Sequence, residues 1–599
     1  MKKILFPLIA LVVLAGCSGG ADEKKKVDFT VQQNGKQVTL KADVDPSVGA
    51  VDYKWVMGKK LDTIQGPEAN YTYAEGGYYD VELLAIDACG NLHTDKQEVA
   101  ADPGLDRKID RGFQPVTNFI ESIVFVSFSF PGLEENVPIV LVILIFGALF
   151  FTIYFRFINF RRFRLAIDIV RGKYSDPNES GEVSHFQALT AALSGTVGLG
   201  NIAGVAIAVG AGGPGATFWM ILAGLLGMSS KFVECTLGVK YREVDEDGRV
   251  YGGPMYYLRK GFTGMKMIVG GKETNFSGIG KTLAAIFAVA AIGGSFGGGN
   301  MFQVNQAFSQ FAAMPFMEGT YVGENGWVFG AIMAVLVGIV IIGGIRSIAK
   351  VTDKIVPFMC GVYVLAALVV LGANFSAIPA AFGAIFEGAF TGEAVTGGVI
   401  GVLIQGFRRA AFSNEAGIGS ASIAHSAVKT NNPASEGLVA LLEPFIDTVV
   451  VCTMTALVIV ITGKYTMASD DGIAITSAAF QETISWFPYL LVVAVILFAF
   501  STMITWSYYG MQAWAYLFGR SKRMEYVYKA IFCIMVIIGA ASSLGAVIGF
   551  SDAMIFSMLF PNIIGLIFLL PVVKNELNDY LGKIKSGEIK TVDLSKKHK

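Results

Sequence analysis

The sequence predicts an all-α polytopic membrane protein with eleven transmembrane helices, preceded by a small β-sandwich. The membrane part is indicated by composition: the 599 residues are 53% hydrophobic and 16% charged, whereas soluble domains carry roughly 25% charged residues. The β-sandwich is indicated by alternating polar and apolar residues within residues 27–102. The net charge of −1 argues against a nucleic-acid partner.

The first segment has the features of a targeting signal. Lys2 and Lys3 precede an apolar run that is too short to cross about 30 Å of hydrocarbon. The run ends in Leu14-Ala-Gly-Cys17, which resembles a bacterial lipobox. The resemblance implies that residues 1–16 are a lipoprotein signal peptide, that Cys17 is lipidated, and that the chain after it lies outside the cytoplasm. The alternative is a simple uncleaved anchor.

A small extracytoplasmic domain follows a polar linker at residues 17–26. Residues 27–102 contain Tyr53-Lys-Trp55 and then a Tyr-x-Tyr…Gly-x-Tyr-x-Val pattern that begins at Tyr71. These residues resemble a PKD-type, immunoglobulin-like β-sandwich. Such modules usually bind a ligand or act as spacers. The ligand of this domain is unknown, and the domain contains no catalytic constellation. Residues 103–134 are predicted to link it to the membrane.

Eleven apolar segments within residues 135–575 are predicted to span the membrane. The amphipathic stretch 375–394 is predicted to lie at the outer face, and residues 576–599 to form a frayed cytoplasmic tail. The predicted spans are 136–157, 186–210, 216–240, 281–311, 327–345, 355–374, 395–426, 437–462, 488–517, 527–549 and 551–573.

The distribution of basic residues predicts the orientation. The outward loops 312–326 and 375–394 contain no Lys or Arg. The loop after the first span, in contrast, carries Arg156, Arg161, Arg162, Arg164, Arg171 and Lys173. Because cytoplasmic loops are enriched in Lys and Arg, we expect a bacterial inner-membrane protein with the N-terminal domain outside and the C-terminus in the cytoplasm.

Two glycine-broken stretches interrupt predicted spans, at residues 194–201 and 413–420. Backbone that leaves a helix in hydrocarbon exposes N–H and C=O groups at a cost of several kcal/mol each. Such a break survives only where protein or a water-filled cavity surrounds it. Two breaks at matching places in two halves of a membrane protein indicate the site of a transporter.

The spacing of the breaks predicts the topology of the helices. Without the first span, the breaks fall in the first and the sixth of ten spans. The second half therefore enters the membrane in the opposite sense, which gives a 5+5 inverted repeat with one extra N-terminal span. This is the arrangement of the LeuT-like fold.

The residues around the breaks resemble the alanine or glycine:sodium symporters. The resemblance covers residues 135–575 and implies uptake of a small neutral amino acid, alanine or glycine, driven by Na⁺ as coupling ion, with no organic cofactor. It is carried by Gly198-Leu-Gly-Asn-Ile-Ala-Gly-Val-Ala-Ile-Ala-Val, Gly212-Gly-Pro-Gly-Ala-Thr-Phe-Trp-Met, Gly252-Gly-Pro-Met-Tyr-Tyr, Gly299-Asn-Met-Phe-Gln-Val-Asn-Gln, Phe412-Ser-Asn-Glu-Ala-Gly-Ile-Gly-Ser-Ala and Phe500-Ser-Thr-Met-Ile-Thr-Trp-Ser-Tyr-Tyr-Gly.

The predicted substrate site lies between the two breaks. Backbone N–H groups at the first break suit the substrate carboxylate, and the resemblance implies a substrate contact for Gln303. Each polar residue also has a structural alternative: Asn201 as a helix cap, Gln303 as an interhelical bond, and Trp506 as ordinary packing. The predicted substrate-binding residues are Gly198, Gly200, Asn201, Gln303, Ser413, Asn414, Gly417, Gly419 and Trp506.

The resemblance also implies an oxygen-only Na⁺ site, which suits a hard cation. Its hydroxyls come from Ser501 and Thr502, and its carbonyls from Ser194, Val197 and Phe498. The alternative is that both hydroxyls bond back to their own helix.

Three titratable residues near the breaks have alternative roles. Glu415 is predicted to pair with Arg408 or Arg409, the alternative being a coupling group. His185 and His425 are predicted to be boundary residues rather than proton carriers.

Two other functions remain open from the sequence. One is a proton-coupled transporter that uses Glu415, His425 and His185. The other is a lipid-anchored binding or sensor protein whose PKD-like domain carries the recognition. The chain is not predicted to be an enzyme, because no cluster combines a nucleophile, a base and an orienting group.

Overall fold

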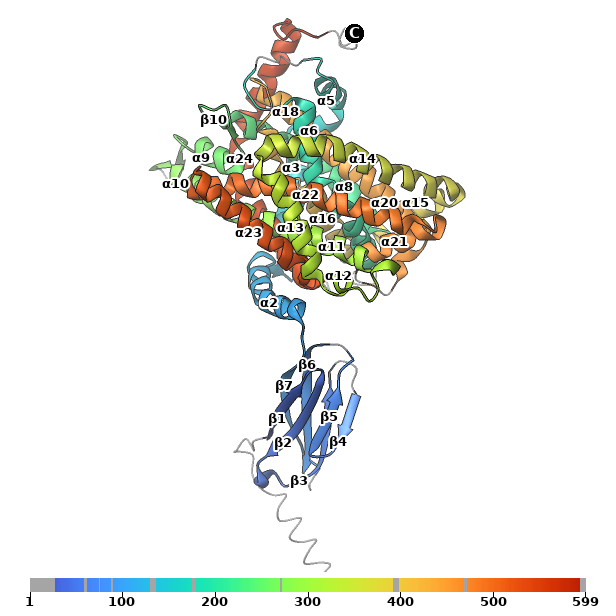
Figure 1. Ribbon diagram of the computed structural model, residues 1–599. Coiled ribbons are helices and arrows are strands. Elements are labelled where there is room, and N and C mark those ends of the chain that lie inside the picture. Colours follow the sequence, from blue (N-terminus) through green and yellow to red (C-terminus); the bar gives the residue numbers. More distant parts are fainter. Residues whose placement is uncertain are drawn as a thin grey trace, which may run out of the picture. The chain divides into compact units, whose positions relative to one another are not determined.

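The computed structural model describes residues 27–592 except 59–61, 75, 88–89, 130–135, 175–178, 270–271, 392–397, 468 and 470 (Figure 1). The predicted signal peptide, Cys17 and the linker at residues 17–26 lie outside the described residues. The chain divides into two compact units, one ending at Arg111 and the other beginning at Gly112. Each unit is described by itself.

The first unit is an antiparallel β-structure around Trp55, as predicted for this segment. Trp55 is fully buried, its ring centroid is 5.2 Å from that of Phe29, and its Nε1 donates to the Gly66 carbonyl at 2.8 Å. The sheets have the orders β1-β2-β5 and β4-β3-β6-β7. The strands are β1 (Val27–Asn34), β2 (Gln37–Val44), β3 (Ala50–Met57), β4 (Asp62–Gln65), β5 (Glu68–Thr72), β6 (Gly77–Asp87) and β7 (Leu92–Ala101).

The second unit is helical, and α22 runs through it in contact with α6, α10 and α14 (Figure 1). Its helices, the first of which begins in the other unit, are α2 (Leu105–Val124), α3 (Ile139–Tyr154), α4 (Ile158–Arg161), α5 (Phe163–Val170), α6 (His185–Thr196), α7 (Val205–Gly212), α8 (Ala216–Lys240), α9 (Pro254–Gly261), α10 (Ser277–Phe296), α11 (Phe302–Ala312), α12 (Tyr321–Glu324), α13 (Gly326–Ile342), α14 (Gly344–Ala373), α15 (Ile378–Thr391), α16 (Gly398–Asn414), α17 (Ala421–His425), α18 (Pro433–Ala440), α19 (Leu442–Pro444), α20 (Thr453–Ile461), α21 (Gly472–Thr483), α22 (Phe487–Phe518), α23 (Lys522–Ala541) and α24 (Leu544–Ser586).

Short elements join these helices. Three two-stranded sheets pair β8 (Ser127–Phe128) with β9 (Val137–Pro138), β10 (Glu243–Val244) with β11 (Val250–Tyr251), and β12 (Lys266–Val269) with β13 (Lys272–Asn275). Three π-helical segments continue neighbouring α-helices, and such segments often occur at functional sites. They are η2 (Gly200–Gly204), η3 (Gly297–Met301) and η6 (Phe445–Cys452).

Seven helical segments of the described chain are long and apolar enough to cross a membrane, and the bent pair of α6 and α7 makes eight. The three other predicted spans correspond to the shorter helices α3, α13 and α16. The total of eleven spans and the inverted repeat therefore stay predictions. The seven are Ala216–Lys240, Ser277–Ala312, Ser347–Ala373, Pro433–Ile461, Phe487–Phe518, Lys522–Ala541 and Leu544–Ser586.

The C-terminal segment differs from the prediction, because α24 continues to Ser586. Its last turns are held by tertiary contacts: Tyr580 is buried, and Glu576 forms an ion pair with Lys240 at 2.5 Å. Further on, the Val592 N–H donates to the Lys173 carbonyl at 2.8 Å. The expectation that the tail frays from its start was therefore wrong for residues 576–586.

Candidate functional site

Both predicted helix breaks are present. The first follows α6: the chain leaves the helix at Val197 and resumes as η2 with a bend of 54°. A side chain at Gly198 would place Cβ 2.5 Å from Thr502 Oγ1, so the position requires glycine. The second break joins α16 to α17, and there Glu415, Gly417 and Gly419 have positive φ values of 56°, 88° and 97°.

A buried carboxylate that the sequence analysis missed joins the two breaks. Asn201 Nδ2 donates to Asp447 Oδ1 at 2.7 Å, and Ser413 Oγ donates to Asp447 Oδ2 at 2.8 Å. Thr448 Oγ1 donates to the same Oδ2 at 2.8 Å. No Lys, Arg or His among the described residues forms an ion pair with Asp447. The available signal was an acidic residue inside a predicted apolar span.

The N–H groups predicted to bind a carboxylate are occupied by side-chain amides. Gly198 N–H donates to Asn201 Oδ1 at 2.9 Å, and Leu199 N–H donates to Gln303 Oε1 at 3.0 Å. Gln303 Nε2 donates in turn to the Gly298 carbonyl at 2.8 Å. Asn201 thus caps the break, and Gln303 forms a hydrogen bond between helical segments, as the two structural alternatives predicted. Their oxygens lie where a carboxylate oxygen could replace them.

A small cavity of about 10 Å³ lies at the breaks. The predicted residues Gly200, Gln303 and Trp506 line it. The triple glycine of η3 lets two lining side chains pack on its backbone: a Cβ at Gly298 would lie 2.3 Å from Ile555, and one at Gly299 would lie 2.2 Å from Trp506. The other lining residues were not among the predicted substrate-binding residues; they are Gly195, Thr196, Gly298, Phe412, Glu415 and Ile555.

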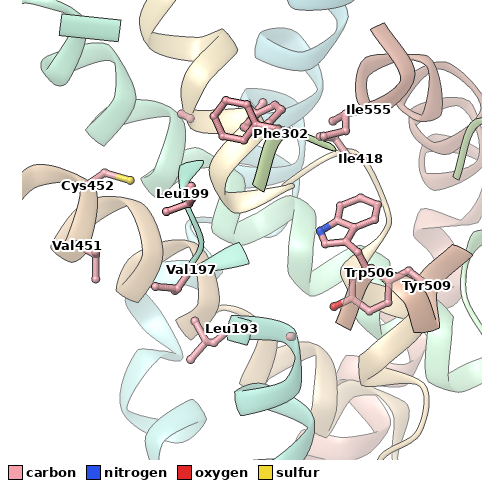
Figure 2. Close-up of a cluster of buried hydrophobic side chains, with 14 of the residues drawn as sticks. Leu193, Val197, Leu199, Phe302, Ile418, Val451, Cys452, Trp506, Tyr509 and Ile555 are labelled. Atoms are coloured by element: carbon pink, nitrogen blue, oxygen red, sulfur yellow. The ribbon is translucent and has the colours of Figure 1, made fainter. Parts of the chain in front are cut away.

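Trp506 closes one side of this cavity. Its Nε1 donates to the Gly195 carbonyl at 3.3 Å, and its ring centroid is 5.3 Å from that of Tyr509. Figure 2 shows the two rings side by side on α22, across from Val197 and Leu199 of the first break.

The four predicted residues of the second break do not line the cavity: Ser413 binds Asp447, and the other three make different contacts. Asn414 Nδ2 donates to Thr448 Oγ1 at 2.9 Å, and the Gly417 carbonyl accepts from Asn562 Nδ2 at 2.9 Å. A Cβ at Gly419 would lie 2.8 Å from Pro254, so this glycine allows close packing against α9. These residues therefore hold the second break against neighbouring helices and do not face the cavity.

The five residues predicted to bind Na⁺ are all buried, and bonds join four of them. Thr502 Oγ1 donates to the Ser194 carbonyl at 3.1 Å, which brings α22 against the end of α6. Ser501 Oγ donates to the Phe498 carbonyl of its own helix at 3.0 Å, as in the alternative interpretation. Ser194 Oγ donates to the Ser501 carbonyl at 3.1 Å. The fifth, Val197, lies in the break itself.

The predicted pairing of Glu415 was wrong. Both arginines pair with Asp552 of α24, with Arg408 Nε 2.8 Å from Asp552 Oδ2. Glu415 instead accepts a hydrogen bond from Ser420 Oγ. The reason is local: Glu415 follows the end of α16 with left-handed backbone, so its side chain leaves the face that carries the arginines.

Both histidines are buried beside acidic side chains, and their position at a membrane boundary stays a prediction. His425 Nδ1 lies 2.6 Å from Glu436 Oε1, and its Nε2 lies 3.4 Å from Glu443 Oε2. His185 pairs with the other oxygen of Glu436, and Lys231 Nζ lies 3.1 Å from Glu443 Oε1. This buried network connects α6, α8, α17, α18 and α19.

Long apolar helices, two breaks joined by one carboxylate and a small cavity beside them define a membrane transport protein. The profile described as "Sodium:alanine symporter family" matches residues 129–594. The profile of the PKD domain matches residues 26–97, and that of the prokaryotic membrane lipoprotein lipid attachment site matches residues 1–18. The chain belongs to the sodium:alanine symporter family.

Curated relatives agree with this membership. "Sodium/alanine symporter AgcS" of Methanococcus maripaludis is 38% identical over 76% of this chain and 96% of the relative. "Probable sodium/glutamine symporter GlnT" of Bacillus subtilis is 32% identical over 75% of this chain and 89% of the relative. Among solved structures, MhsT in complex with L-phenylalanine is 15% identical, covering 67% of this chain and all of the other, with a TM-score of 0.44.

Proposed function

We propose that the protein couples inward movement of Na⁺ to uptake of a small neutral amino acid, alanine or glycine. The observation that carries the proposal is Asp447. A buried carboxylate without a basic partner is costly, and a cation bound beside it would offset that cost. Asp447, Ser413 and Thr448 offer oxygen ligands of the kind that hard cations prefer.

A second group of oxygens supports Na⁺ coupling at the other side of the first break. Ser194 lies near the end of α6 and Val197 lies in the break. Ser501 and Thr502 lie on α22, where the Thr502 hydroxyl donates to the Ser194 carbonyl. Cation binding to both groups would hold α6, η2, α22 and η6 in one arrangement. Substrate and ion would then stabilise the same state, which is the physical basis of coupling.

The substrate would bind as a zwitterion at the small cavity, which has room for about one water molecule and must widen to accept it. Its carboxylate would accept from the Gly198 and Leu199 N–H groups, displacing the oxygens of Asn201 and Gln303. Glu415 is the acidic residue of the cavity wall and would accept from the ammonium group. Phe412, Trp506 and Ile555 leave little room for a side chain, which favours alanine and glycine.

A second cavity also lies along α22, near the loops rich in basic residues. This larger cavity of about 360 Å³ is lined by Tyr508, Met511 and Gln512 of that helix, together with Arg249 and Glu525. We propose it as the exit for the amino acid. Its mixed charges suit a zwitterion.

The energy available is sufficient. One Na⁺ moving through 100 mV releases about 2.3 kcal/mol, and a tenfold Na⁺ gradient adds about 1.4 kcal/mol. A symporter of one Na⁺ per amino acid would therefore concentrate its substrate at most several hundred-fold.

The direct test is uptake of radiolabelled L-alanine into proteoliposomes with an inward Na⁺ gradient, and again with K⁺ in place of Na⁺. We expect uptake only with Na⁺. Glycine as a competitor then distinguishes the two substrates. Equal uptake in both salts at constant pH would reject sodium coupling.

Proton coupling is the second candidate, and the histidines favour it. His425 lies between Glu436 and Glu443, so protons could be exchanged along the buried network. In this case uptake in K⁺ would persist and increase with an inward proton gradient.

The N-terminal domain is proposed to be an accessory. Deletion of residues 27–102 is expected to leave the initial rate of Na⁺-driven uptake within about twofold of the full chain, because every residue placed in the site lies in the second unit. The same assay measures it, with equal protein reconstituted. Loss of uptake would instead support the binding or sensor hypothesis.

The orientation follows from the loop charges. We propose an inner-membrane protein that is cleaved after residue 16 and lipidated at Cys17, with residues 27–102 outside, residues 135–575 as the transport domain and residues 576–599 in the cytoplasm.

A further inference from the structure

Helix α2 lies outside the residues that match the symporter family, yet it packs on the transporter. We propose that residues 113–125, called the lid below, cover the outer end of the substrate path. The lid also keeps Asp552 from separating from Arg408 and Arg409, with which it forms ion pairs. This inference rests on the proposed function, because a lid requires a path to cover.

The ion pair lies one helical turn from the cavity. Phe412 and Ile555 line the cavity, and Arg409 and Asp552 come three residues earlier on the same two helices, α16 and α24. The Arg409 guanidinium carbon is 5.3 Å from the centre of the Phe412 ring. Because Asp552 binds both arginines, it joins α16 to α24 immediately beyond the cavity.

The ion pair is incompletely satisfied. Arg409 is 3% exposed and Asp552 is fully buried. Nevertheless, Arg409 Nε and Nη1 and Asp552 Oδ1 have no hydrogen-bond partner among the described residues. A buried ion pair stabilises little unless its remaining groups are bonded. Packing from outside is therefore needed to keep the two helices together.

The lid supplies that packing to both helices. The Arg408 guanidinium carbon lies 4.6 Å from the centre of the Phe125 ring, and Phe125 is 5.8 Å from Phe556 of α24. Phe113 packs edge to face on Phe550 at 5.0 Å. Thr117 Oγ1, which is buried, donates to the Ala546 carbonyl at 3.1 Å.

An acidic residue of the lid lies beside the ion pair. Burial raises the pKa of Glu121, while Arg408 opposes this rise and Asp552 adds to it. A Cβ at Gly549 would lie 2.6 Å from Glu121 Oε1 and 2.8 Å from Thr117 Cγ2, so the lid sits directly on the α24 backbone. Opening toward the outside must therefore break lid contacts before the ion pair separates.

The test measures access to the cavity from outside. In a full-length chain whose cysteines other than Cys17 are replaced, Ile555→Cys is the reporter, because Ile555 is 1% exposed. A membrane-impermeant thiol reagent is added to intact cells. We expect labelling of the Phe113→Ala/Phe125→Ala variant to be ~2- to 10-fold faster, since each lost aromatic contact has a modest energy.

Two further variants make the result decisive. Gly549→Ala adds a methyl group against the lid from the transporter side and should also speed labelling. Phe119→Ala, at a residue of α2 that is 67% exposed, is the matched control and should leave the rate unchanged. Labelling after solubilisation measures the protein present in each case.

The outcomes separate the lid from the proposed function. Faster labelling in both test variants supports the lid, whether or not the protein takes up alanine. Unchanged labelling in both, or equal acceleration in Phe119→Ala, would overturn it even if Na⁺-driven uptake is normal.

Discussion

Asp447→Asn is expected to lower the initial rate of Na⁺-driven uptake roughly 100-fold, the order expected when one partner of a buried charge interaction is removed. The substitution keeps the size of the side chain but removes the negative charge proposed to bind a cation. The half-saturating Na⁺ concentration should therefore rise. Uptake is measured at several Na⁺ concentrations with equal protein reconstituted.

A control and a partner variant sharpen this prediction. Asp353→Asn, at an exposed residue of α14, should leave both rate and Na⁺ dependence unchanged. Asn201→Ala should abolish uptake, because it removes the donor to Asp447 Oδ1 and the acceptor of the Gly198 N–H. Since the residues are in contact, the double variant should be little worse than either single one. Normal transport in Asp447→Asn would refute the proposed cation site.

The parts of the site that can be predicted from the sequence are those that a local pattern of residues indicates. Glycine clusters inside apolar runs predicted both breaks, because a break in the helix is one of the few explanations for such clusters at these positions. The breaks also identified Gly200 and Asn201. Thr502 and Trp506 were found through the family motifs that contain them, and the structure places both against α6 or the break after it.

The parts that sequence missed depend on distant contacts. Asp447 meets Asn201 across 246 residues, and Arg408 meets Asp552 across 144 residues. No local pattern states which of several buried charges will pair. Glu415 was therefore predicted to pair with Arg408 or Arg409, which are close to it in sequence, whereas the left-handed backbone at Glu415 turns its side chain away. The isolated acidic residues inside apolar spans were the usable signal.

The π-helical segments are a second feature that was not predicted from the sequence. η3 and η6 differ from α-helix by one hydrogen-bond register, a change too small to alter hydrophobic periodicity. Both nevertheless lie at the site: η3 provides the glycines beside Trp506, and η6 carries Asp447. The position of the cavity therefore could not be derived from spacing, although the helices around it could.

Thr502→Ala is expected to reduce Na⁺-driven uptake below about 1% of the wild-type rate while the protein stays folded. Thr502 Oγ1 is the hydroxyl that reaches across to the Ser194 carbonyl, so its loss removes a proposed Na⁺ ligand and a contact between α22 and the first break. Thr502→Ser keeps the hydroxyl and should restore most of the rate. Uptake and its Na⁺ dependence are the measurements.

A hydroxyl on the same helix provides the matched control. Ser507 is buried and donates to the Ile504 carbonyl of its own helix at 2.6 Å, so Ser507→Ala should lose little activity. If Thr502→Ala behaves like Ser507→Ala, the hydroxyl serves helix packing alone and the Na⁺ site lies elsewhere. If only Thr502→Ala fails and only serine rescues it, the requirement is for an oxygen at that position, as cation coordination demands.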